Sequence, residues 1–153
     1  MIAIARAETR TRYRGVRREG TRWQHQARVL GVALDCIGLV GATGVRLGLA
    51  SARRWLADDD LRRYPRIPDS AMLLASCRHL LVEIPLADVA DADVYVLAHQ
   101  RHPNLPTHFA FAATHGGERT IIHAEMFSRR VIENRMGPRW IATHAFRLPE
   151  LAA

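Results

Sequence analysis

Asp35 and Cys36 are neighbours whose types and placing suit a reactive thiol. Asp35 fits the N-cap of a helix, and apolar residues follow it at nearly helical spacing, which places Cys36 in the first helical turn. A helix N-terminus carries partial positive charge, and cysteines at such sites reach pKa values of about 3.5–7.5. The pattern therefore predicts a nucleophilic thiolate at Cys36. The same pattern is also typical of a buried structural thiol, so the two interpretations stand side by side.

A nucleophilic thiol needs a base and a third group that orients the base, and two histidines have suitable positions. His108 lies in Thr107–Thr114, which alternates as a strand does, and His123 lies in the next predicted strand, Thr120–Ala124. The glycine pair Gly116–Gly117 between them predicts a hairpin turn, which would put the two histidines side by side. Cys36, His108 and His123 would then form a Cys–His–His site. A strand histidine is, however, more often a half-buried residue with satisfied hydrogen bonds.

The first half of the chain reads as helices and loops, and these must position Cys36. An amphipathic, arginine-rich helix is predicted over residues 2–18, an ordered loop over 20–34, a surface loop over 57–68 and a helix over 69–82. The helix that begins at Cys36 carries a glycine at nearly every third position, which indicates close packing against another backbone. We therefore expect it to be a buried central helix, and we expect Cys77 of the later helix to be a core thiol.

The second half changes to the period of strands. Strands are predicted over 93–97, 107–114, 120–124 and 129–134, followed by a short helix over 138–140 and a last strand over 145–148. In the strand of His108, Phe109 and Phe111 are expected to face the core. Helices first and an antiparallel sheet afterwards indicate an α+β fold. A length of 153 residues fits a single domain, 1–153.

Composition limits the classes of function. The net charge is +7, every basic residue is arginine, and eight arginines fall in the first 28 residues. That cluster is either a solvated face or a surface for anions, but nucleic acid is an unlikely partner because interleaved aromatics are missing. No apolar run is long enough for a membrane span, and the start does not read as a secretory signal. We therefore expect synthesis in the cytoplasm, free cysteines, and no metal or other cofactor.

Several segments together resemble a known family. The string LDCIGLV (Leu34–Val40), the strand THFAFAA with its histidine, and IIHA about fifteen residues later are similar to the NlpC family of bacterial cell-wall cysteine peptidases. These are papain-like enzymes whose motif is an Asp-Cys-x-Gly-Leu-Val helix start. The short members found in phage tails, prophages and gene transfer agents are the most similar branch. In that branch an aromatic residue followed by His-Gln stands thirteen positions before the cysteine, as Trp23 does here with His25 and Gln26.

The resemblance extends over about residues 20–150, and the segments YPRIPDS (Tyr64–Ser70) and AFRLPE (Ala145–Glu150) also belong to it. It implies a papain-like fold with the N-terminal helices packed on an antiparallel sheet. Cys36 matches the family nucleophile, His108 its general base and His123 the residue that orients the base. Asp35, Trp23 and His25 match supporting positions.

The resemblance also implies a substrate and a place of action. The family hydrolyses peptidoglycan stem peptides, typically between D-glutamate and the diamino acid. The branch implies an enzyme at the tip of a phage tail, among other tail proteins, which opens the cell wall for DNA delivery. The alternative is a tail-tip assembly protein that keeps the fold with weak or no hydrolysis.

Three departures from the family pattern bear on that choice. Ile37 follows the cysteine where Ser or Ala is usual, Trp23 replaces the usual Tyr, and Ala92 stands where Gly is common. Ile37 would either narrow the cleft or face the core.

Overall fold

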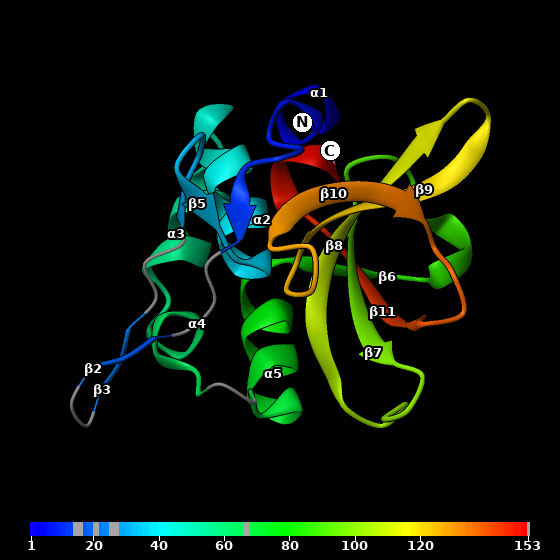
Figure 1. Cartoon of the computed structure of the whole chain (residues 1–153). Coiled ribbons are helices and arrows are strands. Elements are labelled where there is room, and N and C mark those ends of the chain that lie inside the picture. The colour runs from blue at the N-terminus through cyan, green and yellow to red at the C-terminus, as the bar shows by residue number, and fades with distance from the viewer. Residues whose placement is uncertain (14–16, 20–21, 25–27, 66–67, 153) are drawn as a thin grey trace.

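The computed structural model of the chain describes residues 1–13, 17–19, 22–24, 28–65 and 68–152 (Figure 1). The α-helices are α1 (Ile2–Ala7), α2 (Cys36–Arg46), α3 (Ala50–Ala57), α4 (Asp59–Arg63) and α5 (Ser70–Leu80). The short strands are β1 (Arg12–Tyr13), β2 (Arg17–Glu19), β3 (Arg22–Gln24), β4 (Arg28–Val29), β5 (Ala33–Leu34) and β6 (Val82–Ile84). The longer strands are β7 (Val94–His99), β8 (Pro106–His115), β9 (Glu118–Glu125), β10 (Arg130–Arg135) and β11 (Trp140–Arg147). Two 3₁₀ turns, η1 (Leu86–Asp88) and η2 (Pro149–Leu151), complete the described elements.

One large sheet organises the molecule. Nine strands follow the order β4-β5-β1-β10-β9-β8-β7-β11-β6, and the five long strands at its centre pair in antiparallel fashion. Helices α2 to α5 gather on one side of these strands, and most helices precede them in the chain (Figure 1). The mixture of helices and a large antiparallel sheet agrees with the predicted α+β class. Among the described residues, no helix combines the length and apolar character needed to cross a bilayer.

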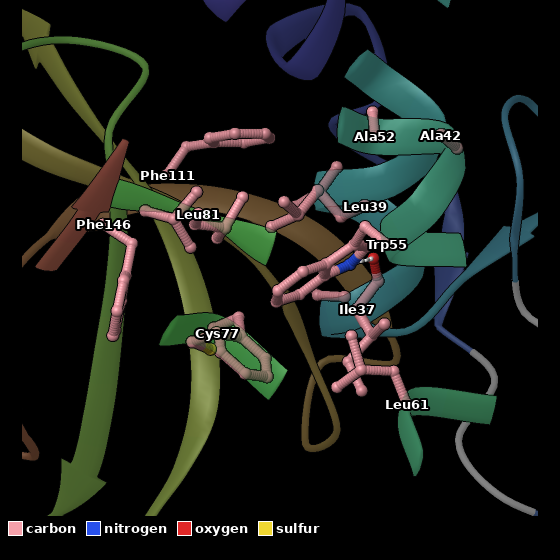
Figure 2. Packing of buried hydrophobic residues seen from close by; sticks show 14 of the residues in the cluster. Ile37, Leu39, Ala42, Ala52, Trp55, Leu61, Cys77, Leu81, Phe111 and Phe146 are labelled. Carbon is pink, nitrogen blue, oxygen red and sulfur yellow. Dashed lines mark hydrogen bonds between the residues drawn. The ribbon is translucent and has the colours of Figure 1, made fainter. Parts of the chain in front are cut away.

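The main core lies between the helices and the face of the sheet that carries Phe109 and Phe111 (Figure 2). Both phenylalanines are fully buried, as the strand alternation predicted. Trp55 of α3 meets Phe109 edge to face, with ring centroids 5.2 Å apart. Its indole Nε1 donates a 3.0 Å hydrogen bond to the carbonyl of Ile37, which ties α3 to the first turn of α2. Cys77 is buried in this core, as expected.

The glycines of α2 allow α3 to approach closely, which confirms the predicted backbone packing. A Cβ added at Gly41 would collide with Leu56 and Trp55, and one at Gly44 would collide with Ala52. Helix α2 is therefore held against both α3 and the sheet, so that its N-terminus has a fixed position.

The N-terminal predictions were wrong in extent. Helix α1 ends at Ala7 instead of residue 18, because the chain then joins the sheet: the N–H of Arg10 bonds the carbonyl of Val131, and that of Tyr13 bonds Arg129. Within the predicted loop over 20–34, the described residues form β3, β4 and β5, and the predicted loop over 57–68 contains α4. For residues 10–13, pairing partners on β10 that are distant in sequence outweigh local helix propensity.

The C-terminal elements also differ from prediction. In place of a short helix over 138–140 and a strand over 145–148, the single strand β11 runs from Trp140 to Arg147. It pairs with β7 from Trp140 opposite His99 to Phe146 opposite Val94, with an irregularity between Ala142 and His144. This early start brings Trp140 into the sheet.

Candidate active site

The first turn of α2 is fixed by its cap. Asp35 is 1% exposed and its carboxylate accepts a 2.5 Å hydrogen bond from the N–H of Gly38, as predicted for an N-cap. The other carboxylate oxygen accepts a 3.2 Å hydrogen bond from the hydroxyl of Tyr64. Tyr64 thus places a phenol at this helix start. It is a different position from that of Trp23, where the family that the sequence resembles usually has tyrosine. Cys36 follows as the first helical residue.

The sulfur of Cys36 lies against strand β8. Strands β8 and β9 pair only as far as Phe111 opposite Ile122, although β8 begins at Pro106 and β9 continues to Glu125. In the segment of β8 beyond that ladder, the backbone N–H of Phe109 donates to the Cys36 sulfur. The N-terminus of α2 therefore meets β8 one residue from His108.

Two histidines from the neighbouring strands form a pair, as the hairpin predicted. The ring nitrogens His108 Nε2 and His123 Nδ1 are 2.8 Å apart, and the ring planes are nearly perpendicular at 78°. The second nitrogen of His123, Nε2, lies 3.3 Å from Oδ1 of Asn134 on β10. A continuous line of polar contacts thus runs from Asn134 through His123 to His108.

An aromatic side chain covers the histidine pair. The indole of Trp140 stacks on His108 with centroids 4.6 Å apart and planes inclined by 21°, and it meets His123 edge-on at 5.9 Å. His99 of β7 touches the same indole edge-on at 5.7 Å. Stacking fixes the plane of the His108 ring and removes water from one of its faces.

Burial sets the protonation of the site. It raises the pKa of Cys36 to about 12, and the carboxylate of Asp35 adds to that rise, while the N–H groups of Phe109, Ile37 and Cys36 itself act against it. The predicted lowering of this pKa is therefore wrong: a few N–H dipoles do not offset removal of the sulfur from water beside a carboxylate. Cys36 is partly exposed as a residue, but its sulfur is surrounded by protein.

Both histidines are held neutral. Burial and the neighbouring His123 keep the pKa of His108 well below its usual range. Burial also lowers the pKa of His123, although Glu125 and the hydrogen bond with Asn134 favour its charged form. The resting site at neutral pH thus consists of a thiol and neutral imidazoles.

The remaining predicted residues have different outcomes. Trp23 lies on β3, which pairs with β2 opposite Arg18, and His25 lies outside the described residues. Ile37 is 1% exposed and packs in the core, so it does not narrow a cleft. Ala92 has a φ of 77°, in the left-handed region that glycine adopts without strain.

Sequence reasoning missed Asn134 and Trp140. Asn134 was placed in a strand, but its role depends on register: it pairs opposite Ile121, diagonal to His123. Trp140 fell at the end of the short helix predicted over 138–140, and only the early start of β11 brings it to His108. Within the described part of the chain, no three histidine, cysteine or carboxylate side chains gather in a way that would hold a metal ion.

Comparison with known proteins gives similarity of fold only. No protein-family model matches the chain, and no match among curated proteins is significant. The crystal structure of an N-acetylmuramoyl-L-alanine amidase from Bacteroides uniformis matches with a TM-score of 0.50 and 10% identity, covering 95% of this chain and 97% of the other. A second crystal structure of an N-acetylmuramoyl-L-alanine amidase from the same organism matches with a TM-score of 0.45 and 11% identity, covering 95% and 96%. The first match supports a shared overall architecture.

Proposed function

We propose that this chain is a papain-like cysteine peptidase that hydrolyses amide bonds in peptidoglycan stem peptides. The observation that carries the proposal is the position of the Cys36 sulfur at a helix N-terminus, against the backbone next to His108, which in turn contacts His123. The arrangement offers a nucleophile, a base and a residue that orients the base, as acyl transfer requires.

The protonation of the site suggests how the reaction starts. Because Cys36 is a thiol and His108 a neutral imidazole, His108 would take the sulfur proton as the sulfur attacks the amide carbon. The N–H groups of Cys36 and Ile37 at the helix start are suited to stabilise the oxyanion. His108 would then give the proton to the leaving amine as the C–N bond breaks, which leaves a thioester.

Hydrolysis of the thioester completes the cycle. His108 would take a proton from the attacking water, the C–S bond would break, and the proton would return to Cys36. The products are a carboxylic acid and the amine released earlier, so no oxidant, reductant or cofactor enters the reaction.

Two lines support a cell-wall substrate. The Asp-Cys-x-Gly-Leu-Val helix start with both histidines resembles the NlpC peptidases, and the fold is similar to that of a protein named for amidase activity on N-acetylmuramoyl-L-alanine. The first line favours the bond between D-glutamate and the diamino acid. The amidase name adds the muramoyl–L-alanine bond as the alternative to be tested.

The place of action forms a further part of the proposal. The resemblance to the phage-tail branch favours assembly into a tail tip and action on the cell wall during DNA delivery. Two of the N-terminal arginines have internal partners: Arg6 pairs with Glu133 at 2.8 Å, and Arg28 bonds the carbonyls of Leu56 and Leu61. A docking surface for tail proteins would therefore use other arginines of that segment.

The test is digestion of purified peptidoglycan, of both common diamino-acid types, with mass spectrometry of the products. Wild-type protein should release new amino groups on the diamino acid, and Cys36→Ala should release none while it remains folded. Cys77→Ala removes the same atom from the buried thiol of α5 and should stay active. Equal digestion by wild type and Cys36→Ala would refute the mechanism. New amino groups on L-alanine would mean that the muramoyl–L-alanine bond is the one hydrolysed.

The assembly alternative predicts a different result. Particles with Cys36→Ala should then deliver DNA normally, whereas deletion of the chain should stop tail assembly. Under the hydrolase proposal, Cys36→Ala particles should assemble and adsorb but deliver DNA less well through cross-linked peptidoglycan.

A further inference from the structure

Asn134 occupies the outer end of the polar contacts that lead to His108. Its Oδ1 lies 3.3 Å from His123 Nε2, and His123 Nδ1 lies 2.8 Å from His108 Nε2. An amide oxygen only accepts hydrogen bonds, whereas each nitrogen of a neutral imidazole either donates or accepts. The atom of Asn134 that faces His123 therefore affects which nitrogens of His123 and His108 carry protons.

We infer that Asn134 is a positioning residue that fixes the tautomers of both histidines, so that Nδ1 of His108 is left free to accept a proton. With Oδ1 accepting, His123 carries its proton on Nε2, and its Nδ1 accepts. His108 must then donate from Nε2, so its proton is also on Nε2. The remaining nitrogen of His108, Nδ1, is bare and can act as the base toward Cys36.

The opposite arrangement would disable the base. If His123 carried its proton on Nδ1, it would donate to Nε2 of His108, and His108 would hold its own proton on Nδ1. His123 Nε2 would then face Asn134 Oδ1 as two acceptors 3.3 Å apart, which is unfavourable. His123 is fully buried, so few other hydrogen-bonding groups reach it. Its tautomer is therefore set by its neighbours His108 and Asn134.

The role of Asn134 as a positioning residue rests on the proposed function, but the tautomers can be measured without any substrate. In protein with ¹⁵N-labelled histidine, two-bond proton–nitrogen correlation spectra distinguish Nε2–H from Nδ1–H. His108 and His123 should both be Nε2–H in the wild type. In Asn134→Leu the Nδ1–H form of the pair should become populated. Arg135→Ala, an exposed neighbour on β10, is the matched control and should leave both tautomers unchanged.

Asn134→Asp provides a conservative rescue. An aspartate oxygen still accepts from His123, so both histidines should remain Nε2–H. The added negative charge favours imidazolium, so the acid limb of the pH–rate profile should move to higher pH; Glu125 and Arg139, which also act on His123, stay constant in this comparison. Asn134→Leu should lower kcat about two- to tenfold, the range of one hydrogen bond, with little change in KM.

Two results would overturn the inference. Nδ1–H on both histidines of the wild type would mean that the amide of Asn134 faces His123 with its nitrogen. Unchanged tautomers in Asn134→Leu would mean that another contact sets them. If the expected tautomer change is observed but the wild type hydrolyses no stem peptide, the proposed function fails while the tautomer assignment holds.

Discussion

Acid should destabilise this protein because His108, half-buried beneath Trp140 and beside His123, is held in its neutral form. The pKa of His108 is far below its usual range in the folded state, whereas an unfolded histidine titrates near 6.5. The unfolded chain therefore binds more protons on acidification, and folding stability, fully present above pH 6.5, is lost as the pH falls. If His108 stays neutral when folded, the loss of folding stability from this residue is about 1 kcal/mol at pH 5.5 and about 3 kcal/mol at pH 4.5.

The substitution His108→Gln isolates this effect, because glutamine does not titrate. Urea unfolding at several pH values between 7.5 and 4.5 should show that wild-type stability falls more steeply than that of His108→Gln, by about the amounts above. The carboxylates Glu125 and Glu133 titrate at lower pH and are common to both proteins. His79→Gln, at an exposed position of α5, should keep the wild-type slope. Parallel pH dependence in wild type and His108→Gln would refute the burial argument.

Further predictions concern reactivity and packing. Cys36 should be alkylated faster than Cys77 in the folded protein, because only Cys36 is partly exposed. Both thiols should react faster as the pH rises, since burial raises the pKa of each. Faster labelling of Cys77, measured by mass spectrometry of the labelled peptides, would contradict the first prediction. Gly41→Ala should lower the free energy of unfolding by about 1–3 kcal/mol because α3 fills the space, whereas Gly137→Ala, with no atom within 4 Å, should change it little. Ala92→Gly should raise the free energy of unfolding by roughly 1 kcal/mol, because it removes an alanine from a left-handed backbone conformation. A lower Tm of this variant would contradict the assumption that Ala92 is strained.

The sequence was most informative where local rules act alone. The cap at Asp35, the start of α2 at Cys36 and the hairpin at Gly116–Gly117 each depend on neighbouring residues, and the structure contains all three. Because strand alternation is also local, the pairing of His108 with His123 followed from it. The catalytic roles of these residues remain predictions.

Interactions between distant segments could not be predicted in the same way. Residues 10–13 join the sheet because their partners lie on β10, more than a hundred residues later. The pKa of Cys36 has the same origin: it depends on how much of the sulfur is covered by β8, which no local pattern reports. Asn134 and Trp140 reach the histidines only through the register of β10 and the early start of β11.

The position of Ile37 bears on whether the site is suited to catalysis. Successive residues of a helix point about 100° apart, so that when Cys36 faces β8, Ile37 must face elsewhere. It enters the core, and its carbonyl accepts the hydrogen bond from Trp55 that joins α3 to this turn. A large apolar side chain there therefore strengthens the support of the helix start and points away from the side on which Cys36 meets β8. This departure from the family pattern gives no reason to prefer the assembly alternative, so the choice depends on the chemistry of Cys36 and His108.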